Sequence, residues 1–198
     1  MPELPLDQRE RLELCSLLLE LGPDAPTLCE GWTTFDLAAH LTLREHFRRW
    51  GPARMQSTKA LGFPAIVARL QRGAPLVPWR IPRLRTFLNG TEYFIHHEDV
   101  RRANGQSRRT DRPDLDQLAW RTTGLLGRGS ARAIRPFGLE LRTPDGRCRR
   151  FGSSPAAVVT GQPTELLLYA SGRRTVAEVQ VSGDADAVAA LKKGSGRL

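Results

Sequence analysis

The stretch Thr91-Glu92-Tyr93-Phe94-Ile95-His96-His97-Glu98-Asp99-Val100 decides how the rest of the chain is interpreted. It belongs to a segment whose composition predicts a helix, and residues four apart on a helix lie nearly one above the other. One stripe of that helix therefore holds a carboxylate and an imidazole between two apolar residues: Leu88, Glu92, His96 and Val100. We expect such a stripe to face a core, where a carboxylate needs a partner that neutralises it.

Two interpretations of the stripe are open from these residues alone. Glu92 and His96 can pair only with each other, as a common i,i+4 couple on a helix. Alternatively, both can bind one metal ion, which would require a third ligand from elsewhere in the chain. The Glu-x-x-x-His pattern does not decide between them, because so short a motif often occurs by chance.

The composition sets the class of protein. The chain has 198 residues, 40% of them hydrophobic, which is enough for one large or two small domains. It has no run of 18 apolar residues and no signal-peptide pattern at its N-terminus, so we expect no membrane span and no leader. Cys15, Cys29 and Cys148 are widely spaced, with no Cys-x-x-Cys pair to suggest a disulfide framework or a thiolate zinc site. We therefore expect a cytoplasmic protein.

The net charge is +9, which makes nucleic acid the first partner to consider. Residues 1–110 contain 16 basic and 12 acidic residues, and the remainder contains 14 and 9, so no basic tail is present. Only three of the 30 basic residues are lysines, a bias typical of GC-rich coding. A nucleic-acid-binding module is therefore the least favoured of the functions that we consider.

The N-terminal part is expected to be helical. Start and stop signals predict four helices, at residues 6–21, 33–50, 59–72 and 82–103. Thr33 with Asp36 three residues later is an acidic capping-box pattern at the start of the second. A fifth helix begins after residue 113 and weakens through three glycines, where packing or a domain boundary is expected: Gly124, Gly127 and Gly129.

His40 is the best candidate for the third ligand. It lies on the apolar face of the second expected helix, whereas His46 points elsewhere and is interpreted as a surface histidine. A histidine on an apolar face can also be an ordinary hydrogen-bonded core residue. Together with Glu92 and His96, it would place two imidazoles and one carboxylate in a helical bundle. That ligand set suits Zn²⁺, with Fe²⁺ or Ni²⁺ as alternatives, and leaves a fourth position open.

Other polar residues surround this candidate site. Asp99, one turn after His96, can accept a hydrogen bond from the imidazole N–H. His97 is rotated by about 100° and is interpreted as a flanking or substrate-facing residue. Arg44 and the Arg101-Arg102 pair could attract an anionic substrate, although we prefer to interpret them as solvated helix ends.

From residue 137 the pattern changes from helical to strand-like. Alternation over 138–143, a turn at 144–146 and a return through 147–151 predict a hairpin. Further strands are expected at 158–160 and 176–181, and further helices at 163–170 and 184–193. The sequence thus predicts a helical bundle at residues 1–132 followed by a small α+β domain at residues 133–198.

Two motifs of the bundle resemble the mycothiol-dependent maleylpyruvate isomerase family, within the DinB-like superfamily of four-helix metal-binding bundles. They are Leu28-Cys29-Glu30-Gly31-Trp32-Thr33 followed by Asp36-Leu37-Ala38-Ala39-His40-Leu41, and Glu92-x-x-x-His96-x-x-Asp99-Val100. The tail resembles the small C-terminal domain of that family through Thr160-Gly161-x-Pro163-x-Glu165-Leu166-Leu167-Leu168 and Val179-x-Val181-x-Gly183-Asp184. The resemblance follows nearly the whole chain in order. It is strongest to actinobacterial members described only as metal-binding proteins.

The resemblance implies a mostly α fold, with a DinB-like four-helix metal-binding bundle followed by a small α+β, sterol-carrier-like domain. Carried over position by position, it implies His40, Glu92 and His96 as the metal ligands, with zinc as the metal. Catalytic members hold a low-molecular-weight thiol on zinc as thiolate, for isomerisation or S-transfer. This implies mycothiol or another small thiol as cosubstrate, and a small anionic or electrophilic substrate. The alternative function is a non-catalytic metal- or small-ligand-binding protein.

Overall fold

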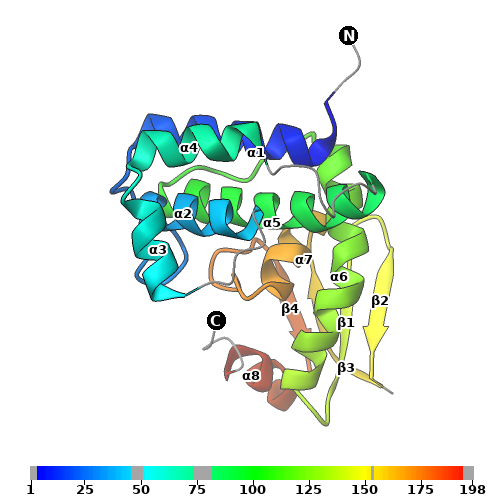
Figure 1. Ribbon diagram of the computed structural model, residues 1–198. Helices are drawn as coiled ribbons and strands as arrows, with labels where there is room; N and C mark the ends of the chain where they lie inside the picture. Colours follow the sequence, from blue (N-terminus) through cyan, green and yellow to red (C-terminus); the bar gives the residue numbers. More distant parts are fainter. Residues whose placement is uncertain (1–3, 46–50, 74–81, 153, 194–198) are drawn as a thin grey trace. The chain divides into compact units, whose positions relative to one another are not determined.

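Helices dominate the first half of the chain, and all the strands among the described residues lie in the second, as Figure 1 shows for the computed structural model. The structure describes residues 4–45, 51–73, 82–152 and 154–193. The chain divides into two compact units, residues 1–110 and 111–198. Within the described ranges, no helix is both long enough and apolar enough to span a membrane.

The first unit contains five helices in its described part: α1 (Leu6–Leu21), α2 (Thr34–Glu45), α3 (Pro52–Lys59), α4 (Phe63–Arg72) and α5 (Pro82–Ala103). α1 packs against α5 and α4, and α2 packs against α3 and α4. The apolar residues between them form one core, whose fully buried members include Leu14, Leu18, Leu37, Leu41, Ile66, Leu70 and Val100. This core fixes α2 and α5, the two helices that carry the candidate ligands.

The helix expected at residues 59–72 is α4, which begins four residues later, at Phe63. Gly62 precedes it with a φ of +82°, a backbone conformation that side-chain-bearing residues rarely adopt. Pro64 lies in the first turn of α4, where the missing N–H of proline does no harm. The short helix α3, which Pro52 opens, was not predicted from the sequence.

The start of α2 follows the capping chemistry that the sequence predicts. The Thr33 backbone N–H donates to Asp36 Oδ2 at 3.1 Å, and the Phe35 N–H donates to Thr33 Oγ1 at 3.2 Å. Lys59 of α3 adds an ion pair to Asp36 at 2.8 Å. The described part of α2 ends at Glu45, so His46 and the expected end of this helix near residue 50 lie outside the described residues.

The stripe on α5 is buried at one end only. Val100 is fully buried and His96 is 8% exposed, but Leu88 at the other end is 37% exposed. From Tyr93 to Val100 every residue is buried, including the charged ones. This half of α5 is therefore enclosed on all sides, and its polar residues must find partners within the protein.

The second unit is a small α+β structure. It contains α6 (Pro113–Ala133), β1 (Gly138–Arg142), β2 (Cys148–Phe151), β3 (Pro155–Thr160), α7 (Pro163–Ala170), β4 (Gln180–Gly183) and α8 (Ala185–Lys193). The strand order is β2-β1-β3-β4, with β1 and β3 parallel and the outer pairs antiparallel. The expected hairpin is confirmed as β1 and β2, joined with Arg142 opposite Cys148. The strand expected at 176–181 begins only at Gln180, because turns at residues 173–177 precede it.

The division between the units falls near residue 110, rather than at the expected residue 132. α6 belongs to the second unit because it packs mainly on α7 and also contacts β1, β2 and α8. Two of its three glycines serve this packing. A Cβ atom on Gly127 would lie 2.6 Å from the Phe151 ring, and one on Gly124 would lie 2.8 Å from the Arg149 guanidinium. The sequence pattern showed that glycines weaken this helix, but it did not show which neighbouring side chains require a glycine there.

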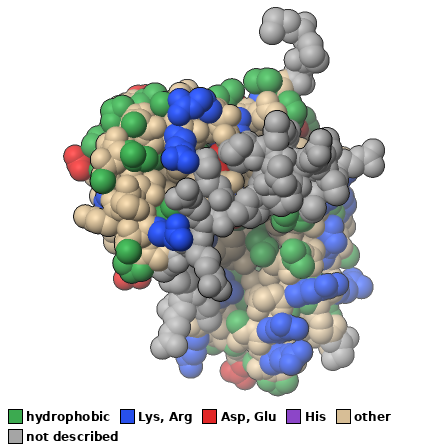
Figure 2. Space-filling model, viewed as in Figure 1, with side chains coloured by type: hydrophobic (Ala, Val, Ile, Leu, Met, Phe, Trp, Pro, Cys, Tyr) green, Lys and Arg blue, Asp and Glu red, His purple; other side chains and the backbone are tan. Residues whose placement is uncertain are grey.

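The excess positive charge is spread over both units. Figure 2 shows Lys and Arg side chains over both the N-terminal helices and the C-terminal unit on the face that it presents. Several arginines are also committed to internal ion pairs, such as Arg102 and Arg109 with Glu98, and Arg142 and Arg150 with Glu140. This distribution does not single out a surface for a polyanion.

Candidate metal centre

Side chains from α2 and α5 converge on one point of the first unit. His40 reaches it from α2, and Glu92 and His96 reach it from consecutive turns of α5. Glu92 Oε1 lies 3.4 Å from His96 Nε2 and 3.9 Å from His40 Nε2. One ligand atom of each residue lies within 4.8 Å of those of the other two. The structure thus brings together the three side chains that the sequence selected, although they are up to 56 residues apart.

This donor set fits a tetrahedral metal ion. Zinc bound at about 2.0–2.2 Å places neighbouring donor atoms roughly 3.3 Å apart. The two separations from Glu92 Oε1 are within about 0.6 Å of that value, and the ligand atoms of the two histidines lie within 4.8 Å of each other. Two neutral imidazoles and one carboxylate are also a common ligand set for zinc, with a fourth position left for water or substrate.

Glu92 has a second partner in Arg44. The Nε atom of Arg44 lies 3.3 Å from Glu92 Oε1, and its Nη1 donates to Asn89 Oδ1 at 3.0 Å. Burial alone would raise the pKa of Glu92, but hydrogen bonds from His40 and His96 and the charge of Arg44 lower it well below its usual range. Arg44 is therefore paired with the Glu92 carboxylate, and the preferred interpretation of Arg44 as a solvated helix end is wrong. Glu92 is ionised and partnered even without a metal ion.

The two imidazoles are held differently. His96 Nδ1 lies 2.9 Å from Asp99 Oδ2, so Asp99 occupies the place that its spacing predicts. Burial would lower the pKa of His96, but hydrogen bonds with Asp99, Cys29 and Glu92 raise it well above its usual value. His40 Nδ1, in contrast, is buried and has no hydrogen-bond partner among the described residues. The His40 ring packs instead against Trp32, with 5.0 Å between ring centroids.

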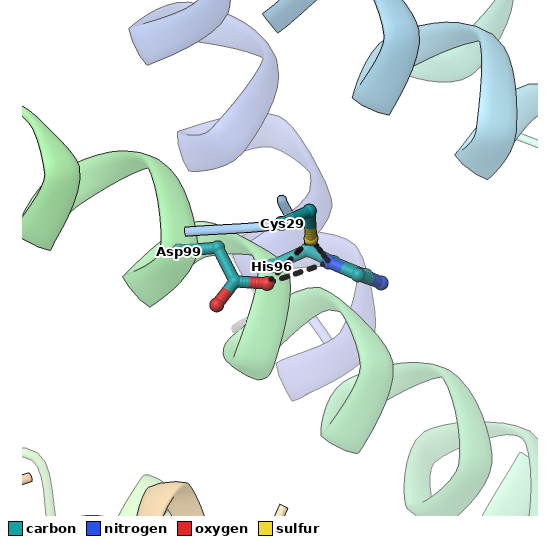
Figure 3. A group of neighbouring side chains, drawn as sticks. All are labelled: Cys29, His96 and Asp99. Carbon is teal, nitrogen blue, oxygen red and sulfur yellow. Dashed lines mark hydrogen bonds and ion pairs between the residues drawn. The ribbon is translucent and has the colours of Figure 1, made fainter. Parts of the chain in front are cut away.

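Cys29 and Trp32 are the site residues to which the sequence analysis gave no role. Cys29 Sγ lies 3.3 Å from Asp99 Oδ2 and 3.8 Å from His96 Nδ1, and Figure 3 shows the three side chains pointing toward one another. Both residues belong to the motif that precedes α2. Their position beside the His40 helix was the signal that could have drawn attention to them.

His97 faces away from this site. Its Nδ1 lies 3.3 Å from Glu10 Oε2 on α1, and burial lowers its pKa despite that hydrogen bond. Arg109 Nη1 donates to both oxygens of Glu10 at 2.8 and 3.0 Å, and its Nε donates to Glu98 at 2.8 Å. His97 is therefore part of a buried ion-pair network with Glu10, and of the two interpretations, flanking or substrate-facing, this contact favours a flanking residue.

Arg101 and Arg102, the other residues considered for attracting an anionic substrate, also belong to this ion-pair network. Arg102 Nε donates to Glu98 Oε2 at 2.8 Å, and Arg101 Nε lies 3.4 Å from Glu98 Oε1. Both guanidinium groups pair with the buried Glu98, so the preferred interpretation of Arg101 and Arg102 as solvated helix ends is wrong, and these pairings do not support a role in attracting substrate. His97, Glu10 and Glu13 lie close enough together for a cation, but Arg109 already supplies a positive charge there at 2.8–3.4 Å.

Comparisons with known proteins support the fold. No protein-family model matches the sequence, and no curated protein shows a significant match to it. Two solved structures are similar: the crystal structure of mycothiol-dependent maleylpyruvate isomerase, at 21% identity and a TM-score of 0.55, and that of a mutant of the same enzyme, at 20% and 0.54. Each alignment covers 92% of this chain and 95% of the other. The chain therefore shares the fold of that isomerase, as its motifs predicted.

Proposed function

We propose that the protein binds a divalent metal ion through His40, Glu92 and His96, with zinc as the first candidate and iron or nickel as alternatives. The observation that carries this proposal is the convergence of His40 Nε2 and His96 Nε2 on one Glu92 oxygen, at 3.9 and 3.4 Å. The shared fold adds support, because bundle cores commonly hold metal ions between side chains of facing helices. We further propose that α1, α2, α4 and α5 are the four helices of a DinB-like bundle.

Asp99, Glu92 and Arg44 would have distinct roles at the proposed metal site. Asp99 accepts the Nδ1 proton of His96, so a metal ion would bind at Nε2 by replacing the proton that now faces Glu92. Glu92 contributes the negative charge, and Arg44 holds its carboxylate from one side at 3.3 Å. When bound, zinc would offer an open position at which a thiol loses its proton near neutral pH.

For the activity, we propose a thiol-dependent isomerase or S-transferase of the cytoplasm. The thiol would be mycothiol or another small thiol, because the similar solved structures are those of a mycothiol-dependent enzyme. The second substrate would be a small electrophilic or anionic molecule.

One observation favours a second candidate function, that of a non-catalytic small-ligand-binding protein. Arg44 and the two histidines already neutralise Glu92, so the charge of the cluster is balanced without a metal ion.

Elemental analysis of purified variants tests the metal proposal. We expect one equivalent of metal in the wild type after growth in zinc-supplemented medium, and its loss in His40→Ala, Glu92→Ala and His96→Ala. Glu30→Ala is the matched control, because this carboxylate is exposed and lies outside the cluster. Stoichiometric metal in His40→Ala would exclude the proposed site, and a wild type that binds no metal would favour the non-catalytic candidate.

Addition of a thiol tests the proposed activity. Cobalt in place of zinc should give an intense sulfur-to-cobalt absorption band when mycothiol or another small thiol enters the open position. The experiment needs a variant with Cys15, Cys29 and Cys148 replaced by serine, so that no protein thiol produces the band. If this variant binds cobalt but shows no band with cellular thiols, the thiol-dependent activity is excluded.

A further inference from the structure

The loop before α2 is fastened to the end of α5 that carries Asp99. The Leu28 backbone N–H donates to the Asp99 carbonyl at 3.2 Å, and the Asn104 side chain donates to the Pro26 carbonyl at 3.0 Å. Within the loop, the Cys29 N–H donates to Thr27 Oγ1 at 3.2 Å. These bonds anchor the backbone up to Cys29, so the position of its thiol is set by the fold rather than by chance contact.

The thiol meets the carboxylate that orients His96. Asp99 is completely buried, and its Oδ2 atom accepts hydrogen bonds from His96 Nδ1 at 2.9 Å and from Cys29 Sγ at 3.3 Å. Both donors therefore share one oxygen (Figure 3). A buried carboxylate oxygen that receives a second donor is held in a defined rotamer, because turning away would leave both donors unsatisfied.

We propose that Cys29 is a positioning residue of the metal centre: its S–H donates to Asp99 Oδ2 and holds that carboxylate where it keeps the His96 proton on Nδ1 and leaves Nε2 for the metal. This inference rests on the proposed metal function. It adds a residue, more than 60 positions from His96 in the sequence, that touches no metal itself. The order of contacts is thiol, carboxylate, imidazole, metal.

The same three side chains could instead bind a cation directly, because their ligand atoms lie within 4.8 Å of one another. The distances favour hydrogen bonding. His96 Nδ1 and Asp99 Oδ2 are 2.9 Å apart, an ordinary N–H···O separation, and the thiol lies nearer to the carboxylate than to the imidazole. A metal ion at this point would take Nδ1 from Asp99 and remove the group that orients the ring. The hydrogen-bonded arrangement satisfies all three groups.

The expected effect can be measured as metal affinity. Removal of a group that orients a metal-bound histidine typically lowers affinity by about 10–100-fold. A thiol is a weak donor and acts one contact further away, so we expect Cys29→Ala to weaken zinc binding by about tenfold. Asp99→Ala should cost more within that range. Cys29→Ser retains a donor and should recover most of the affinity. Cys148→Ala, at an exposed cysteine in the second unit, should leave affinity unchanged.

A double-mutant cycle separates positioning from general support of the loop. If Cys29 acts through Asp99, Cys29→Ala in the Asp99→Ala background should cause no further loss of zinc affinity. Zinc dissociation constants would be measured by competition with a chromophoric chelator, and folding would be checked by circular dichroism. Should Cys29→Ala be poorly folded, Cys29→Val in both backgrounds supplies the same comparison, because valine fills the space of the thiol but has no donor.

Three results would overturn the inference. The first is unchanged affinity in Cys29→Ala, and the second is an equal loss in both Asp99 backgrounds. The third is a sulfur-to-cobalt band in cobalt-loaded wild type without added thiol that disappears in Cys29→Ser, because Cys29 would then be a ligand. A fourth result, a wild type that binds no metal, would overturn this inference and the proposed function together, whereas the first two results leave the proposed metal site intact.

Discussion

Acid should destabilise the first unit through Glu10. This residue is completely buried, accepts two hydrogen bonds from Arg109 and lies 3.3 Å from His97. Burial alone would raise the pKa of Glu10, but the hydrogen bond with His97 and the charge of Arg109 lower it from 4.5 to about 2. Folding therefore favours the ionised carboxylate, and protonation works against the folded state.

The size and direction of the effect follow from these two pKa values. Because the folded-state pKa lies below the unfolded value, the stabilisation is fully present above pH 4.5 and is lost as the pH falls toward 2. A difference of 4.5 − 2 = 2.5 corresponds to about 3 kcal/mol in the free energy of unfolding, at about 1.36 kcal/mol for each pH unit. About 2 kcal/mol of this should be lost by pH 3.

Urea unfolding at pH 6 and pH 3 measures the loss. A Trp120→Phe background leaves Trp32, Trp50 and Trp79, all in the first unit, so fluorescence reports on that unit alone. In this background, we expect the protein to lose about 2 kcal/mol more between the two pH values than its Glu10→Gln variant does. Glu13→Gln is the control, because the Glu13 side chain is 41% exposed. Equal losses with and without Glu10 would refute the assignment of the lowered pKa to this residue.

Three further predictions test the network, the packing and the metal site. Arg109→Met should lower the free energy of unfolding of the first unit by about 3–5 kcal/mol, because Glu10 and Glu98 would lose a buried partner; urea unfolding of Arg128→Met, at an exposed arginine, provides the comparison. Gly127→Ala should destabilise the second unit by about 1–3 kcal/mol in thermal unfolding, since its Cβ would meet Phe151, whereas Gly129→Ala has open space and should be neutral or stabilising by up to about 1 kcal/mol. Cobalt loading should quench tryptophan fluorescence less in Trp32→Phe than in the wild type, because Trp32 packs on His40 at 5.0 Å; equal quenching would place the metal elsewhere.

The sequence predicted the candidate ligands because their relation is largely local. Glu92, His96 and Asp99 lie on successive turns of one helix, so the 3.6-residue period alone places them near one another. Thr33 and Asp36 likewise define the start of α2 by a local hydrogen bond. The only long-range step was the choice of His40, which both its apolar face and the family resemblance supported. Such short-range rules also predicted the β1–β2 hairpin.

The directions of His97, Arg101 and Arg102 could not be predicted in the same way. Periodicity places His97 about 100° from His96, but it does not say what lies there. Its partner Glu10 is 87 residues away, and Arg109 and Glu10 are 99 apart. Charged residues usually indicate solvent, and here they are buried because each finds an opposite charge on another element. A hydropathy pattern cannot distinguish a solvated Glu98 from one enclosed by Arg102 and Arg109.

Cys29 illustrates the same limit at the site itself. Its sequence neighbours say nothing of Asp99, 70 residues away, and a lone cysteine with no Cys-x-x-Cys partner suggests no role. The role emerges only when the loop hydrogen bonds place the thiol on the oxygen that holds His96. In the proposed metal site, the orientation of His96 would thus depend on a contact one step beyond the ligands. A chain that kept His40, Glu92 and His96 but lost the thiol–carboxylate pair would retain the ligand set without the means to orient it.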